Sequence, residues 1–277
     1  VAARSCVLLR NEPVDGAPVL PLSRGTRVAV VGDLADRVNI GDGGSSDVWD
    51  LDCDTVLAGL EAACDEVVHD DGVDPARAAA VAAEADVAVV VVGLTLHDEG
   101  EFIGRTPAEL RDLFPPEDDP TEVERFDAWL ASRPPTVVPA RLEGRDAGFA
   151  EGGDRATLRL GAGDVALVRA VAAANPRTVV VIQAGSSVVV SEWLDEVPAV
   201  VQAWYGGCRA GVGLADVLVG EVAPSGRLPF SVPADEGDLP SFDRDATSFR
   251  YDRWHGWWHL ERTGTPPAFP FGFGLSY

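Results

Sequence analysis

The sequence predicts a three-layer α/β/α sandwich around a mainly parallel β-sheet, and three observations support this fold class. First, the chain holds four apolar, β-branched runs: residues 27–31, 86–92, 178–182 and 199–203. Their apolar residues are continuous rather than alternating, which is typical of strands covered by helices on both faces. Second, four helical patterns accompany these runs: residues 55–64, 75–85, 164–174 and 211–219. Third, strands and helices alternate along the chain, which is the signature of an α/β fold.

Local signals set the boundaries of these elements. Asp74 directly precedes the second helix and is expected to cap it, because its carboxylate can accept backbone N–H groups at a helix start. The Asn-Pro pair at 175–176 should end the third helix. Residues 228–232 follow a turn at Gly226, and we expect them to form a strand that closes the sheet and runs antiparallel. No GxGxxG pattern follows the first strand, so a dinucleotide site is not expected.

Two stretches depart from this alternation. Residues 105–150 contain two Pro-Pro pairs and many charges, and we interpret them as an insertion that serves as a lid, a pocket wall or a mobile loop. From residue 235 onward the chain is rich in aromatic and loop-forming residues, and we expect this tail to wrap back across the domain. Residues 1–277 are therefore predicted to form a single domain with an insertion at about 105–150.

The composition of the chain restricts its partners. A formal net charge of −23 argues against nucleic acid and anionic membrane surfaces, because a uniformly acidic surface repels phosphates. The longest apolar run, residues 87–92, is far too short to span a bilayer. The four cysteines are scattered without Cys-x-x-Cys or Cys/His spacing, so we expect free, mostly buried thiols and neither a zinc site nor a disulfide framework. Neither nucleic acid nor a membrane is therefore an expected partner.

The stretch GLTLHDEGEFIG places three carboxylates directly after the most apolar strand. Asp98, Glu99 and Glu101 should lie at the carboxyl edge of the sheet, where ligands bind in open α/β folds. Crowded like charges raise at least one pKa, and a carboxyl group that stays protonated near neutrality can act as a general acid. Asp98 and Phe102 are expected to contact substrate or to order the loop. The alternative is that an acidic protein simply carries acidic residues in its loops.

Several stretches together resemble the C-terminal α/β-sandwich domain of family 3 glycoside hydrolases, the β-glucosidase group. In chain order they are RSCVLLRNE with LPL, VAVVGDLADRVNIGDGGSS, VAVVVVGLTLHDEGEFI, GGDRATLRL, VVVIQAGSSV, AWYGGCRAGVGLADVLVGEVAPSGRLPFSVP and FPFGFGLSY. The pair GEVAPSGRLPFSVP and PFGFGLSY is the most specific. The resemblance covers nearly the whole chain apart from the insertion.

The resemblance implies a retaining hydrolase of terminal β-linked glucose or similar sugars in small glycosides, with no metal or organic cofactor. It implies that an N-terminal (β/α)8 barrel, which would precede Val1, supplies an aspartate nucleophile, while a glutamate of this domain is the acid/base. Glu99 matches the acid/base loop best, and Glu101 and Glu151 are the alternatives. Retention requires the two carboxyl groups to lie about 5–5.5 Å apart. The chain by itself is expected to be inactive.

The same resemblance suggests supporting roles for other loop residues. In GDGGSS, Gly43, Ser45 and Ser46 are expected to contact sugar hydroxyls near the domain interface, or else to form an ordinary flexible turn. Asp154 and Arg155 belong to the Gly-Gly-Asp-Arg segment that the family places after the acid/base loop. They are expected to form either an ion pair that orders the active site or a simple surface pair.

The residues alone also allow a cysteine-nucleophile hydrolase or an amidotransferase-like enzyme. Cys208 lies in a Gly-Gly-Cys turn between a strand and a helix, as in a nucleophile elbow, and a helix N-terminus lowers a thiol pKa. The histidines, however, show no diagnostic spacing for a base. A non-catalytic carbohydrate-binding module is a third alternative. Trp254, His255, Trp257 and Trp258 could stack on a sugar ring, with core packing or domain docking as the alternative.

Overall fold

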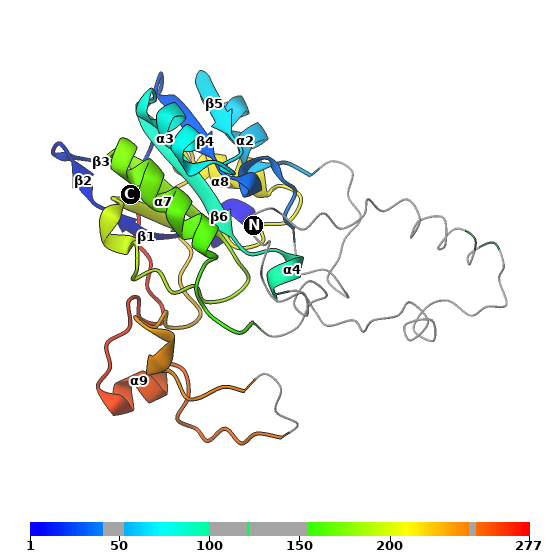
Figure 1. Ribbon diagram of the computed structural model, residues 1–277, viewed down its shortest axis with the longest axis vertical. Helices are drawn as coiled ribbons and strands as arrows, with labels where there is room; N and C mark the ends of the chain where they lie inside the picture. The colour runs from blue at the N-terminus through cyan, green and yellow to red at the C-terminus, as the bar shows by residue number, and fades with distance from the viewer. Residues whose placement is uncertain (41–52, 100–120, 122–123, 125–154, 244–247) are drawn as a thin grey trace.

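A six-stranded β-sheet forms the centre of the molecule (Figure 1). The computed structural model describes residues 1–40, 53–99, 155–243 and 248–277, together with Thr121 and Glu124. The strand order is β1-β8-β7-β6-β4-β5. The strands are β1 (Val7–Asn11), β4 (Arg27–Val31), β5 (Glu66–Asp70), β6 (Val87–Gly93), β7 (Thr178–Gln183) and β8 (Ala199–Gln202). Strand β1 pairs with β8 in antiparallel orientation, and all other neighbours are parallel.

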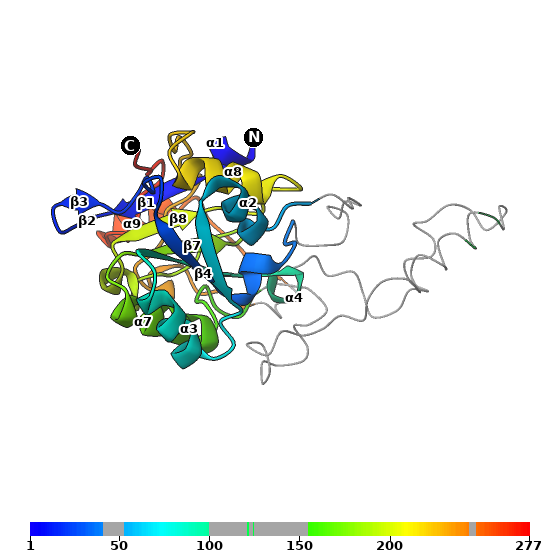
Figure 2. The same cartoon turned by 90° about the horizontal axis from the view of Figure 1, so that it is seen from above.

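Helices cover both faces of this sheet, so that it is the middle of three layers. Figure 2 shows α3 and α7 on one face and α1, α2 and α8 on the other. The α-helices are α1 (Ala2–Ser5), α2 (Val56–Ala63), α3 (Pro75–Ala83), α4 (Leu96–Glu99), α7 (Ala162–Ala174), α8 (Ala210–Leu218) and α9 (Trp257–Thr263). The short elements are η1 (Asp33–Asp36), η6 (Leu194–Glu196), η7 (Glu236–Asp238) and the hairpin strands β2 (Pro13–Val14) and β3 (Ala17–Pro18). The predicted α/β/α sandwich is confirmed.

The burial of β6 on both faces of the sheet explains why its sequence is continuously apolar. Successive side chains of a strand point to opposite faces of the sheet. Ala88, Val90 and Val92 belong to the core cluster under α3 and α7, whereas Val87 and Val89 belong to the cluster under α2 and α8. All residues of β6 are buried. Because both faces are covered, every position of the strand favours an apolar side chain.

The predicted helices and strands agree with the structure to within a few residues. Strand β4 occupies the predicted residues, β6 is shifted by one residue, β7 is one residue longer than predicted and β8 is one residue shorter. Asp74 caps α3, since its carboxylate accepts hydrogen bonds from the backbone N–H groups of Ala76 at 3.0 Å and Arg77 at 3.4 Å. Helix α7 ends at Ala174, directly before the Asn-Pro pair.

The predicted position of the antiparallel strand was wrong. The antiparallel strand of the central sheet is β1, whose Val7 pairs with Gln202 of β8. Residues 228–232 lie outside that sheet, and only Val232 forms an isolated antiparallel bridge, to Phe269. Proline cannot donate a backbone hydrogen bond, and Pro229 interrupts the ladder that a regular strand would need. The segment instead contributes buried side chains, Leu228 and Val232, to the core.

The tail wraps back across the domain as predicted. The backbone N–H of Leu275 donates to Leu8 O at 2.8 Å, which forms an isolated antiparallel bridge to the edge strand β1. The Tyr277 hydroxyl donates to Val217 O of α8 at 2.8 Å. In Figure 1 the chain leaves the sandwich, forms α9 below it and returns beside β1.

The thiols are only partly as expected. All four cysteines are free, but only Cys6 is buried, and burial raises its pKa to about 12. Cys53, Cys64 and Cys208 are half-buried, which corrects the expectation of mostly buried thiols. They lie at loops and helix ends, where packing is less complete than in the strands. Within the described ranges, no helix is long and apolar enough to cross a membrane.

Candidate active site

The carboxylates predicted to be functional follow the carboxyl end of β6. The chain turns sharply there at Gly93, whose φ is +148° and where an added Cβ would lie 1.9 Å from Gln183 O. Only glycine fits this approach of two neighbouring strands. The buried Asp98 carboxylate accepts hydrogen bonds from Thr95 N at 2.9 Å and Thr95 Oγ1 at 3.1 Å, which closes the first turn of α4. Of the two roles predicted for Asp98, these contacts favour loop ordering.

Glu99, at the end of α4, has the densest set of polar contacts in this region. Its Oε1 accepts hydrogen bonds from Gly185 N at 2.5 Å and from the Tyr205 hydroxyl at 2.7 Å. Its Oε2 accepts one from Ser186 Oγ at 2.7 Å and lies 3.5 Å from Arg155 Nε. The side chains of Glu99 and Arg155 are each 10% exposed. We call these five residues the Glu99 cluster.

Arg155 makes further contacts inside the cluster. Its Nη2 donates to Ser186 Oγ at 2.8 Å and to Ser187 O at 2.6 Å. The Ser186 hydroxyl therefore accepts from the arginine and donates to the carboxylate. The guanidinium, hydroxyl and carboxylate form a chain of charge-assisted hydrogen bonds, which are stronger than bonds between neutral groups. The pairing of Arg155 with Asp154, one of the predicted alternatives, concerns a residue outside the described ranges.

The sheet brings these residues together because loops after adjacent parallel strands meet at one edge. Gly185 and Ser186 follow β7, and Tyr205 follows β8. The side-chain amide of Gln202 donates to Ala184 O at 3.0 Å and links these two loops. Burial and then the charge of Glu99 raise the pKa of the Tyr205 hydroxyl. The tyrosine consequently keeps its proton and remains a donor to the carboxylate.

Trp204 sets the direction of the loop after β8. It has a φ of +61°, a left-handed conformation that is rare for a bulky residue. Its indole Nε1 donates to Ser5 O at 2.9 Å, and its ring packs edge-on against Phe230 with centroids 5.8 Å apart. These contacts compensate a conformation that costs about 1–3 kcal/mol. They fix the backbone directly before Tyr205.

A polar residue from the next loop approaches the same edge of the sheet. The side-chain amide of Asn39, after η1, donates to Leu94 O at 2.9 Å and to Gln183 Oε1 at 3.1 Å. It thereby ties the loop after β4 to the ends of β6 and β7. The stretch with Gly43, Ser45 and Ser46 follows shortly after Asn39 in the sequence, and these three residues lie outside the described ranges.

Several predicted site residues cannot be compared with the structure, because they lie outside the described ranges: Glu101, Phe102, Glu151 and Asp154. The insertion predicted at about 105–150 lies there too, apart from Thr121 and Glu124. Sequence reasoning missed Gly185, Ser186, Tyr205 and Asn39. Each follows the carboxyl end of a parallel strand, as Glu99 does. Applying the rule for strand ends to every strand would have identified them.

An aromatic cleft begins beside the Glu99 cluster. It has a volume of about 1150 Å³ and shares Arg155 and Ser186 with the cluster, while Tyr251, Trp257 and Trp258 line it further away. Trp258 is 51% exposed, and its ring stacks on Trp257 with centroids 4.1 Å apart. These two rings therefore do not pack in the core of this chain. Among the sequence alternatives, stacking on a ligand and docking of another domain remain.

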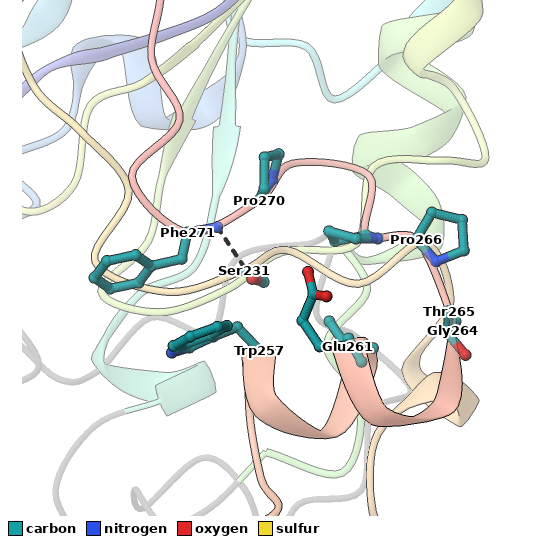
Figure 3. A pocket seen from close by; sticks show the side chains of 10 residues that line it. Ser231, Trp257, Glu261, Gly264, Thr265, Pro266, Pro270 and Phe271 are labelled. Carbon is teal, nitrogen blue, oxygen red and sulfur yellow. Dashed lines mark hydrogen bonds between the residues drawn. The ribbon is translucent and has the colours of Figure 1, made fainter.

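A smaller hollow beside α9 shares Ser231, Trp257 and Phe271 with this cleft. Figure 3 shows Trp257 and Phe271 on one side of it and Glu261 with Pro266 on the other. The Phe271 backbone N–H donates to Ser231 Oγ at 3.1 Å, as the dashed line marks.

Trp254 is half-buried, with the guanidinium groups of Arg253 and Arg262 over its ring. This contact is a cation–π interaction.

The geometry around Cys208 differs from that of a nucleophile elbow. An elbow holds its nucleophile in a strained backbone conformation. Here the positive φ values belong to Trp204 and Gly207, at +61° and +73°, and not to Cys208. The Cys208 carbonyl accepts the backbone N–H of Asp54 at 2.8 Å, and the adjacent Arg209 pairs with the Asp54 carboxylate. The turn therefore serves to anchor the start of α8 to the loop before α2.

Metal ligation has no candidate in the part of the chain that the structure describes, where no group of three or more His, Cys, Asp or Glu side chains could hold an ion. The described carboxylates of the site instead bind hydroxyl, amide and guanidinium donors. The chemistry that the Glu99 cluster itself offers is that of carboxylate, hydroxyl and arginine groups.

Comparison with curated proteins identifies relatives of this chain among β-glucosidases. Probable beta-glucosidase J of Aspergillus fumigatus is 42% identical over 132 residues, which is 46% of this chain and 15% of that protein. Beta-glucosidase of Kluyveromyces marxianus is 40% identical over 165 residues, 58% of this chain and 19% of that protein. These alignments thus cover less than a fifth of either relative.

Solved structures share the fold over the whole chain. The GH3 beta-glucosidase of Bifidobacterium adolescentis has a TM-score of 0.71 and 27% identity, covering 100% of this chain and 35% of that one. Beta-D-glucoside glucohydrolase of Trichoderma reesei has a TM-score of 0.74 at 23% identity, which supports the fold alone. The model of the Glycosyl hydrolase family 3 C-terminal domain matches residues 6–277. The chain therefore belongs to the glycosyl hydrolase family 3 C-terminal domain family.

Proposed function

We propose that this chain is the acid/base-donating domain of a retaining β-glucosidase that releases terminal β-linked glucose, or a similar sugar, from small glycosides. Two findings support the proposal: the family of the domain and the β-glucosidase names of its relatives. The N-terminal barrel that would carry the aspartate nucleophile is the partner domain. A carbohydrate is the substrate, and neither a metal nor an organic cofactor enters the proposed reaction.

The proposed chemistry divides two carboxyl groups between two domains. The barrel aspartate attacks the anomeric carbon, while a protonated glutamate of this domain donates its proton to the leaving oxygen. The same glutamate, now ionised, removes a proton from the water that hydrolyses the glycosyl–enzyme intermediate. Glu99 is the donor that the sequence predicts, and Glu101 and Glu151 are the alternatives.

The observation that carries the proposal is the Glu99–Arg155 contact at the carboxyl edge of the sheet. Glu99 follows β6, and Arg155 precedes α7. Their 3.5 Å contact joins these two parts of the chain at the carboxyl edge of the sheet. In sequence, Glu101 follows Glu99 by two positions and Glu151 precedes Arg155 by four. Glu99, the described candidate donor, therefore lies at the edge of the sheet where ligands bind in open α/β folds.

The decisive experiment compares Glu99→Gln, Glu101→Gln and Glu151→Gln in the full-length protein that joins this domain to its barrel. Aryl β-glucosides with good and poor leaving groups serve as substrates. Loss of the proton donor should lower kcat/KM far more for poor leaving groups, because good ones depart without protonation. Azide should restore turnover of that variant and yield glucosyl azide where deglycosylation limits the rate.

Several results would contradict the proposal. The first is a wild-type full-length protein that does not hydrolyse aryl β-glucosides. The second is a set of three glutamine variants none of which shows dependence on the leaving group. Residues 1–277 alone should show no turnover, since the nucleophile belongs to the barrel, and appreciable turnover would also count against the proposal.

Alkylation of Cys208 should leave the activity of the full-length protein unchanged, whereas loss of that activity would favour the cysteine mechanism.

A further inference from the structure

Building on the proposed function, we infer that Glu99 is a positioning residue: its side chain holds the active-site loops in place and does not itself donate the proton. The inference reverses the role that the sequence favours for Glu99. It depends on the contacts of the Glu99 cluster, which no sequence pattern contains.

Every partner of the Glu99 carboxylate in the Glu99 cluster presents a donor or a positive charge to it. Its two oxygens accept hydrogen bonds from Gly185 N, Ser186 Oγ and the Tyr205 hydroxyl, and Arg155 contributes a positive charge. Gly185 N and the guanidinium of Arg155 can only donate, and the Ser186 and Tyr205 hydroxyls donate to the carboxylate as well. A general acid must instead be protonated when substrate binds.

Access to Glu99 also argues for a positioning role. A proton donor must come within about 2.6–3.2 Å of the atom that it protonates. The Glu99 side chain is 10% exposed, and both of its oxygens already have partners at 2.7 Å or less. A glycosidic oxygen would have to displace one of these donors. Displacement would leave a buried hydrogen-bonding group without its partner, which costs about 1–3 kcal/mol.

The contacts join parts of the chain that are far apart in sequence. Glu99 follows β6, Gly185 and Ser186 follow β7, Tyr205 follows β8, and Arg155 precedes α7. One carboxylate therefore connects the loops after three adjacent strands. A residue placed in this way sets the geometry of its neighbours without contacting substrate.

The surrounding backbone is shaped to hold this carboxylate. An added Cβ at Gly185 would lie 3.0 Å from the Tyr205 ring and 3.3 Å from Glu99 Oε1, so glycine allows the close approach. Trp204 is held in its left-handed conformation directly before Tyr205. Strained backbone persists only where the surrounding structure enforces it, and it concentrates at functional sites. Two independent backbone features thus converge on the partners of Glu99.

The kinetic test replaces Glu99 by Gln in the full-length protein. Loss of positioning should lower kcat/KM by about 100-fold, the effect of misplacing reacting groups by about 1 Å. The factor should be the same for good and poor leaving groups, and the loss should appear in kcat rather than KM. The pH profile should keep both limbs, and azide should form no glucosyl azide. Arg155→Lys should retain more activity than Arg155→Met, because it keeps the positive charge.

Asp70→Asn is the matched control. Asp70 is another buried carboxylate at the carboxyl end of a parallel strand, and it pairs with Arg77 at 2.5 Å. It lies outside the Glu99 cluster, so its replacement should leave kcat/KM within about twofold of wild type. A loss in Asp70→Asn as large as that in Glu99→Gln would show that any broken ion pair at this edge has the same effect, and would overturn the inference.

Two kinetic outcomes would overturn the inference without touching the proposed function. In the first, the loss in Glu99→Gln grows as the leaving group becomes poorer and azide yields glucosyl azide, which makes Glu99 the proton donor. In the second, Glu99→Gln keeps the wild-type kcat/KM on both substrates, which removes any role for the residue in turnover.

Hydrogen exchange tests the positioning separately from turnover, so that failure of the proposed function would be distinguishable. Backbone amides of residues 185–187 and 204–206 should exchange about tenfold faster in Glu99→Gln, since the Gly185 N–H loses its charged acceptor. Strand β6 should keep its protection. The same amides should be unchanged in Asp70→Asn. Unchanged exchange at these loops in Glu99→Gln would overturn the inference whatever the enzyme's activity.

Discussion

Two carboxylates with little solvent exposure, at the same edge of the sheet, pair with arginine in different ways. Asp70 ends β5 and pairs with Arg77, seven positions later in the first turn of α3. Glu99 follows β6 and pairs with Arg155 across residues 100–154. Arg77 is 52% exposed and also contacts Asp71, whereas Arg155 is 10% exposed and contacts two further oxygens of the loop after β7.

This difference separates a pair that stabilises a local turn from one that organises a site. The Asp70 carboxylate also accepts Gly72 N at 2.9 Å, so all of its partners lie within seven residues. Such a pair forms wherever the turn forms. The Glu99 pair forms only when the sheet has assembled, because the partners of Glu99 belong to three other segments of the chain. Its low exposure also means that solvent and salt screen it less.

The largest expected effect on stability is that of Arg155→Met. The substitution leaves the buried Glu99 carboxylate without its positive partner, and it also removes the hydrogen bonds to Ser186 and Ser187. We expect a loss of about 2–4 kcal/mol in the free energy of unfolding, measured by urea denaturation. In a double-mutant cycle, Glu99→Gln and Arg155→Met should couple by about 1–3 kcal/mol. Additive effects would mean that the two side chains do not interact as described.

Asp70→Asn should have a smaller effect. The amide keeps one oxygen for Gly72 N but loses the charged bond to Arg77, and the melting temperature should fall by about 2–4 °C in a calorimetric scan. A decrease larger than that caused by Arg155→Met would reverse the order that the two pairs are expected to follow.

The Asp70 pair should also make stability depend on pH. Burial alone would raise the pKa of Asp70, but the hydrogen bonds from Arg77 and Gly72 outweigh it and lower the pKa. A carboxyl group with a lowered pKa contributes stability above its unfolded pKa of about 3.9 and loses that contribution as the pH falls through the folded value. The urea concentration at the midpoint of unfolding of the wild type should therefore decrease as the pH is lowered below about 4. The part of this decline that Asp70 causes should be missing in Asp70→Asn, and an identical pH dependence would refute the assignment.

The smallest effect is expected for an exposed ion pair, which serves as the reference for negligible stabilisation. Arg10 contacts Asp195 at 3.3 Å, and the Asp195 side chain is 95% exposed. Exposed ion pairs contribute little, because solvent screens them and ordering two side chains costs entropy. Asp195→Asn should shift the melting temperature by less than about 1 °C. A shift comparable to that of Asp70→Asn would show that burial does not rank these pairs.

Sequence reasoning worked best where one strand or helix carries its own signal. The continuous apolar run of β6 predicted a strand covered on both faces, and Asp74 predicted the start of α3. It failed for the antiparallel strand, because β1 is an ordinary short apolar run and its orientation depends on where β8 lies. The return of the aromatic tail to the domain was predicted. The exposure of Trp257 and Trp258 was not.

The sequence by itself determined the α/β architecture, the family and the presence of carboxylates at the end of β6, because periodicity, helix caps and motifs are local properties of the chain. Tertiary structure alone decided what surrounds Glu99. Gly185 lies 86 positions and Tyr205 lies 106 positions from Glu99 in the sequence. They contact Glu99 only because the sheet places β6, β7 and β8 side by side. A hydrogen bond requires its two heavy atoms to lie about 3 Å apart in space, and the spacing of residues in the sequence does not predict which atoms will do so.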